Sequence, residues 1–269
     1  MQNESKETSE ILRAESIPPR KLTAISGSEF ARRTSGMTGA ERQRAALIEL
    51  SNGNVPEFLR NLKPVRLHYI ASGKRKINAV IWVMPDYLAI GSDEDFLRIP
   101  LDFNTAIKIV NEWGFILPTR KIVDAIYEQS TCQLEPVPLK PGPKMRSSEY
   151  YLKHRSKIRS ERKQEGCILG ELTSGDKKDL VITNLLNNKP GRVAIYGWHR
   201  KSGEPIQPLS TYHGEHYADY SHGVRLVYKT AWIDGKPTSI LDVLQDKQLA
   251  PVLTYEGVIR RLLRMLHLK

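Results

Sequence analysis

Residues 65–84 read VRLHYIASGKRKINAVIWVM, and this stretch decides the fold class. Both of its ends are rich in β-branched and aromatic residues, and a polar segment with one glycine separates them. That pattern is typical of a β-hairpin. His68 lies inside the first run, where we expect a packed strand residue. Two shorter runs follow at 86–92 and 96–100, so the sequence predicts an antiparallel meander of four strands.

Helix signals flank these strands. Thr38 and Glu41 have capping-box spacing, which predicts a helix that begins there and ends near Gly53. Apolar residues with helical periodicity, or strings of helix-forming residues, predict further helices. These lie at 105–114, 118–129, 148–163, 240–246 and 257–269, with Ser239 and Asp242 as the cap of the fourth.

The second half of the chain adds more strands. Residues 191–199 are almost continuously apolar, which favours a central strand. Residues 180–183 and 224–233 are β-rich, and Asp234–Gly235 is a strong turn pair after the latter. We therefore expect an α+β protein with a mainly antiparallel sheet and flanking helices.

Composition limits the domain organisation. The polar residues 1–25 contain a Pro-Pro break and are expected to form a flexible tail before a single domain at 26–269. The proline-rich segment 134–144 is expected to be a strap between the two halves of that domain. No apolar run is long enough to span a membrane, and the first residues have no apolar signal core. The protein is therefore either cytoplasmic or exported with its signal removed.

Charge and cysteine content narrow the functional classes. The formal net charge is +11, which favours an anionic partner such as nucleic acid or polysaccharide. Arg155, Arg159 and Arg162 recur with helical spacing and predict one cationic helix face. The basic residues of 257–269, which include Lys269, predict an amphipathic helix that packs on its own domain. Two cysteines do not indicate a disulfide framework, although a single bridge is compatible with the sequence.

Reactive side chains are concentrated in RVAIYGWHRKSGEPIQPLSTYHGEHYADYSHGVRLV, residues 192–227, which holds four of the seven histidines. His199 directly follows the apolar strand, where a rigid scaffold presents side chains to a cleft. Two histidines and a carboxylate are a normal ligand set for catalytic zinc, and His213, Asp219 and His222 supply one. No HExxH motif is present.

A metal-free interpretation uses the same stretch. Asp219 would orient His222 or His199, and the oriented imidazole would act as acid or base. Ser221 lies in no GxSxG elbow, so we interpret it as a hydrogen-bonding loop residue. Neighbouring cations and aromatic residues are expected to bind the substrate: Lys177, Lys178, Arg225, Tyr196, Trp198 and Tyr220.

These features predict a hydrolase with a His- and Asp-lined cleft, acting on a peptide or polysaccharide of the cell-wall type. One alternative is a non-catalytic protein that binds nucleic acid or another polyanion. Another is a metal-free lyase or transferase that uses histidine acid–base chemistry. A divalent metal such as zinc is the expected cofactor of the first interpretation. No glycine-rich phosphate loop or dinucleotide fingerprint is present, so no nucleotide cofactor is expected.

Overall fold

The computed structural model describes residues 12–71 and 73–268, and it is an α+β protein with mainly antiparallel sheets. Strand β2 (Lys76–Val83) organises the larger sheet, because β1 (Lys63–Ile70), β12 (Val227–Tyr228) and β13 (Thr230–Ile233) all pair with it. The sheet is completed at its ends by β14 (Lys236–Ser239) and β5 (Phe115–Ile116).

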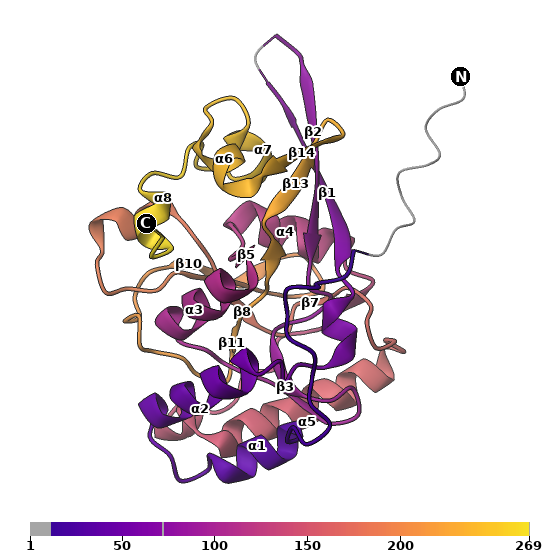
Figure 1. Cartoon of the computed structure of the whole chain (residues 1–269), viewed down its shortest axis with the longest axis vertical. Helices are drawn as coiled ribbons and strands as arrows, with labels where there is room; N and C mark the ends of the chain where they lie inside the picture. Colours follow the sequence, from indigo (N-terminus) through magenta and orange to yellow (C-terminus); the bar gives the residue numbers. More distant parts are fainter. Residues whose placement is uncertain (1–11, 72, 269) are drawn as a thin grey trace.

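The predicted hairpin is confirmed. Strands β1 and β2 pair from Lys63↔Val83 to Ile70↔Lys76, and their far end projects from the rest of the molecule (Figure 1). Val65 and Leu67 point inward, whereas Arg66 and His68 are exposed. The expectation that His68 is packed was therefore wrong, because strand alternation places it on the solvent side.

The expected four-stranded meander is also wrong, since β3 (Ala89–Gly91) and β4 (Phe96–Arg98) form a separate two-stranded sheet. After β2 the chain does not fold back onto the hairpin. The N–H groups of Met84 and Leu88 donate instead to the carbonyls of Leu226 and Val224.

A four-stranded sheet has the order β10–β9–β8–β11, with bounds Pro205–Ser210, Ile195–His199, Lys178–Leu180 and His222–Gly223. Every residue of β9 is buried and the strand is internal, which confirms its predicted central position. Strand β8 pairs antiparallel with β9 and parallel with β11. A last pair joins β6 (Cys132–Gln133) to β7 (Thr173–Ser174).

The principal helices are α1 (Gly27–Arg33), α2 (Gly39–Ser51), α3 (Phe103–Trp113), α4 (Arg120–Gln129) and α5 (Ser148–Gln164). The capping box of Thr38 and Glu41 is present, and Gly114 ends α3 in the left-handed conformation. Helices α1, α2 and α5 lie together at the end of the molecule opposite the projecting hairpin (Figure 1). Short 3₁₀ turns are η1 (Glu57–Arg60), η2 (Pro143–Arg146) and η3 (Asn184–Asn188).

The carboxyl-terminal region differs from expectation. Helix α6 (Ile240–Gln245) forms, but the Ser239 side chain makes no cap hydrogen bond. It is followed by α7 (Ala250–Leu253) and by α8 (Leu262–Met265), which replaces the long helix expected at 257–269. Arg261 has φ 54°, a left-handed conformation that a continuous helix excludes. Leu262 and Leu266 are buried, so this segment packs on its own domain, whereas Lys269 lies outside the described residues.

Four further features bear on the sequence-based expectations. Of the expected tail, residues 1–11 lie outside the described residues, while Ala14 and Ile17 beyond them are buried in the core. The segment 134–144 has no regular structure before Pro143, and its Leu139 is buried. Cys132 and Cys167 form a disulfide, a bridge that the sequence alone did not indicate. Within residues 12–71 and 73–268, no helix has the length and apolarity to cross a membrane.

Candidate active site

The site is built on a distortion of β9. Gly197 and Trp198 have φ angles of 106° and 57°, although strand residues normally have negative φ. A left-handed conformation at a tryptophan is strained, and such strain is concentrated at functional sites. The Trp198 N–H donates to the Lys177 carbonyl at 2.9 Å, and the Lys178 ammonium lies 4.8 Å from the centre of the Trp198 ring. The distortion thus places an aromatic face beside a lysine.

A group of four residues, His213, Tyr217, Asp219 and His222, forms what we call the histidine cluster. The His213 ring stacks on Tyr217 with centroids 4.1 Å apart, and both rings lie within 5.8 Å of the His222 ring. His222 is only 1% exposed, and neither of its ring nitrogens has a hydrogen-bond partner among the described residues. Buried imidazole nitrogens are normally paired, so an unpaired one is available for a ligand or a proton.

Asp219 is held in one orientation by three donors. Its Oδ1 accepts hydrogen bonds from the Ser221 N–H at 2.8 Å and the Ser221 hydroxyl at 2.6 Å. Its Oδ2 accepts from the Tyr217 hydroxyl at 2.9 Å. Burial alone would raise the pKa of Asp219, but His222 and the Ser221 bonds hold that pKa below its usual value. Asp219 is therefore an ionised carboxylate, and Ser221 is its hydrogen-bond donor.

Burial sets the protonation of the neighbouring bases. It lowers the pKa of His222 to about 4, with the nearby Asp219 acting in the opposite direction. His222 is consequently neutral at pH 7 and retains a basic lone pair. Burial also lowers the pKa of the half-buried His213 and of Lys178.

A surface groove lies next to the histidine cluster. It has a volume of about 540 Å³ and is lined by residues of η3, the following loop and the end of β10: Leu185, Lys189, Pro190, Arg192, Leu209, Ser210, Thr211 and Tyr212. Tyr212 is 80% exposed, and its ring lies 5.6 Å from the His213 ring. Tyr212 is thus the groove residue next to His213, and the lining residues include none of the four residues of the histidine cluster.

His199 lies in different surroundings. Its ring stacks on Tyr127 at 4.5 Å, and its Nε2 is 3.3 Å from Asp124 Oδ1. The Tyr196 hydroxyl also donates to Asp124, at 2.7 Å. The aromatic contacts of His199 among the described residues are thus with Tyr127 and Tyr196, and the structure does not bring it into the histidine cluster.

Several expected substrate contacts are interior groups. Lys177 donates to the Tyr220 carbonyl at 2.5 Å, and the Tyr220 hydroxyl accepts from the Leu139 N–H at 2.7 Å. Arg225 is fully buried and donates to the carbonyls of Met84 and Thr173. The structure thus places these three side chains in the interior, hydrogen-bonded to backbone groups, and their expected contact with substrate stays a prediction.

The expected zinc ligands do not form a metal site. Within the described part of the chain, no three His, Cys, Asp or Glu side chains are arranged to hold a metal ion. His213, Asp219 and His222 are close together, but both Asp219 oxygens accept hydrogen bonds from the protein, and His213 lies flat against Tyr217.

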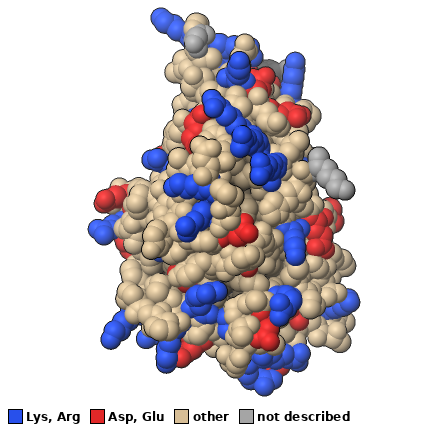
Figure 2. All heavy atoms as spheres, turned by 90° about the vertical axis from the view of Figure 1, so that its left-hand side faces the viewer, with Lys and Arg blue, Asp and Glu red and all other residues tan. Residues whose placement is uncertain are grey.

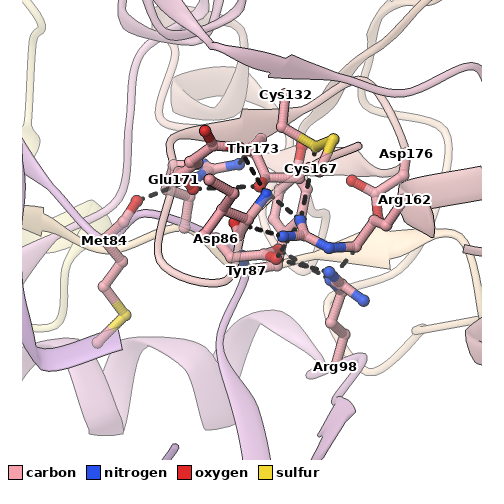
Figure 3. Close-up of polar contacts among 12 residues, drawn as sticks. Met84, Asp86, Tyr87, Arg98, Cys132, Arg162, Cys167, Glu171, Thr173 and Asp176 are labelled. Carbon is pink, nitrogen blue, oxygen red and sulfur yellow. Dashed lines mark hydrogen bonds and ion pairs between the residues drawn. A yellow bond between two sulfur atoms is a disulfide. The ribbon is translucent and has the colours of Figure 1, made fainter. Parts of the chain in front are cut away.

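A second polar cluster was missed by the sequence reasoning. Asp86, Arg98, Arg162 and Asp176 come from separate elements and meet in the interior beside the disulfide (Figure 3). Each is an ordinary charged residue in its local sequence, so no local signal identified the group. Their burial becomes apparent only when β4, α5 and the loop before β8 are brought together.

No protein-family model, curated protein or solved structure matches this chain. The function is therefore inferred from the geometry of the site.

Proposed function

We propose that the protein is a hydrolase that acts on a peptide or polysaccharide of the cell-wall type, with His222 as its general base. The observation that carries this proposal is the unpaired, neutral imidazole of His222 beside the ionised Asp219. A general base must be unprotonated at the working pH and held in place. His222 meets the first condition through burial, and β11 provides the second.

Three residues take part in the proposed reaction. His222 takes a proton from water as the water oxygen attacks the scissile bond. Lys178, opposite His222 in the β8–β11 pair, stabilises the negative charge that develops on the substrate. His222 then passes this proton by way of His213, on the groove side, to the leaving group, so that both imidazoles return to their neutral form. The net result is one water consumed and one bond broken.

The groove favours a polymer that carries carboxylate groups and sugar rings. Arg192 is exposed at its wall, and Lys189 is anchored there by donation to the Thr211 hydroxyl at 2.7 Å. The exposed Tyr212 ring offers a face on which a sugar can stack. The disulfide is typical of proteins in oxidising compartments, where cell-wall polymers are found, and it supports export.

The test is digestion of purified peptidoglycan in water enriched in ¹⁸O, followed by mass spectrometry of the fragments. Hydrolysis predicts one solvent oxygen for each bond cleaved, in the new carboxyl group or the new reducing end. New amino groups would identify a peptide bond, and new reducing ends would identify a glycosidic bond. Cleavage with no solvent oxygen at either new end would indicate the lyase or transferase alternative, and intact polymer would contradict the proposed substrate.

The polyanion-binding alternative is less well supported. The α5 arginines do not form the continuous cationic surface that was expected, because Arg155 pairs with Asp95 at 2.8 Å and Arg162 is buried. On the face shown in Figure 2, Lys and Arg are scattered among acidic residues. A nucleic-acid-binding surface normally gathers its cations on one face, and its affinity falls steeply with salt. Binding of DNA or RNA with that salt dependence would favour this alternative.

A further inference from the structure

We propose that a second pocket, between α5 and the β3–β4 turn, binds a small ligand with two or more phosphate or sulfate groups. The pocket has a volume of about 370 Å³, within the range of small-molecule sites. Five of its lining residues are cationic: Arg98, Arg155, Arg159, Arg162 and Lys163. It shares no lining residue with the groove beside His213.

Hydrogen bonds hold the two arginines of the inner wall in place. Arg98 donates to both oxygens of Asp86, at 2.8 and 2.5 Å, and Arg162 donates to the Thr173 hydroxyl at 2.6 Å (Figure 3). The only other carboxylate beside Arg98 in the described residues is Asp176, 3.7 Å away and without hydrogen bonds. Asp86 and Asp176 offset the charges of Arg98 and Arg162, so the inner wall supplies ordered guanidinium groups and the excess positive charge comes from the rim.

The rim supplies cations that form no ion pair with the residues that the structure describes. Arg159 and Lys163 are four residues apart on α5 and therefore lie on one face of the helix. Both are exposed, and neither forms an ion pair within residues 12–71 and 73–268. Their spacing allows simultaneous contact with two oxyanion groups of one ligand.

The two acidic residues of the pocket have local partners. Asp93 Oδ1 accepts the Phe58 N–H at 3.2 Å, and a hydrogen bond from Ser92 lowers the pKa of Glu94. These carboxylates shape the turn between β3 and β4, and neither pairs with Arg159 or Lys163 in the described structure. Phosphate and sulfate suit the pocket because guanidinium groups bind tetrahedral oxyanions through paired N–H donors.

The test is isothermal titration calorimetry of the whole protein at low salt, in parallel with inorganic pyrophosphate and with a disulfated disaccharide. The pocket variant is R159A/K163A. The control is K153A/K157A, which removes two exposed cations of α5 that do not line the pocket.

We expect saturable 1:1 binding of at least one of the two probes. The affinity for that probe should fall about tenfold or more in the pocket variant and change less than about twofold in the control. The preferred probe then identifies the oxyanion. Equal weakening in both variants would show a general charge effect and overturn the proposal, as would the absence of saturable binding for both probes.

Discussion

Lys178 and His222 lie opposite each other in the parallel pair that joins β8 to β11. Opposed residues of paired strands project to the same face of a sheet, so the lysine and the imidazole are held together by backbone pairing. Strand β9, which pairs with the other side of β8, places Trp198 beside Lys178. A positive charge and a neutral base are thus fixed in position before any substrate binds, which is the arrangement that hydrolysis by activated water requires.

His222 should make stability depend on pH. Its pKa is about 4 in the folded protein and near 6.5 when unfolded, so the unfolded state binds more protons between these values. Stability is therefore lost as pH falls through this window. Between pH 7 and pH 5 we expect His222 to account for roughly 2 kcal/mol of that loss. Urea unfolding should show a smaller loss for H222Q, and an identical loss in both proteins would contradict the burial argument.

Arg225 should be required for stability. Replacement by methionine leaves the buried carbonyls of Met84 and Thr173 without their donor, so R225M should lose about 3 kcal/mol of unfolding free energy. K229A, which removes an exposed cation nearby in sequence, should change stability by less than about 0.5 kcal/mol. Chemical denaturation measures both. An R225M protein of normal stability that has lost activity would instead indicate direct substrate contact.

The disulfide should support the oxyanion pocket. It closes a loop with a sequence separation of 35, and C132S/C167S should lose roughly 2–4 kcal/mol of unfolding free energy. Cys167 lines the pocket, so pyrophosphate binding by the serine variant should also weaken. Thermal melts and calorimetry of the oxidised, reduced and serine forms test this. Equal melting temperatures in all three forms would be inconsistent with it.

Tyr212 should affect substrate binding more than turnover. Removing its exposed ring deletes a stacking surface worth roughly 1 kcal/mol, so Y212A should raise KM about fivefold and leave kcat nearly unchanged. Tyr255 is another exposed tyrosine that does not line the groove, and Y255A serves as the control. Steady-state kinetics on soluble cell-wall fragments would separate the two parameters. A fall in kcat alone would place Tyr212 in a different role.

Local signals in the sequence predicted much of the fold. The Thr38–Glu41 capping box, the hairpin built on β1 and β2, and the Asp234–Gly235 turn each depend on neighbouring residues and were confirmed. The carboxyl-terminal helix is shorter than predicted, because Arg261 adopts the left-handed conformation and interrupts it.

The site was only partly accessible from the sequence. His213, Asp219 and His222 are near in sequence, and the structure brings them together. His199 is also near in sequence, but it faces Asp124, a partner 75 residues away. The Arg98–Asp86–Arg162 cluster likewise joins three elements. Pairings across such distances are set by the topology of the sheets, which residue patterns do not specify.

The role of His222 as general base is tested most directly by the rate of peptidoglycan hydrolysis by H222Q and H216Q, measured beside the parent protein. His216 is a matched control because its side chain is 79% exposed and lies outside the histidine cluster. We expect H222Q to lose at least about 100-fold in kcat and H216Q to stay within about twofold of the parent. A folded H222Q protein that hydrolyses the polymer at the parental rate would contradict the role of His222 as general base.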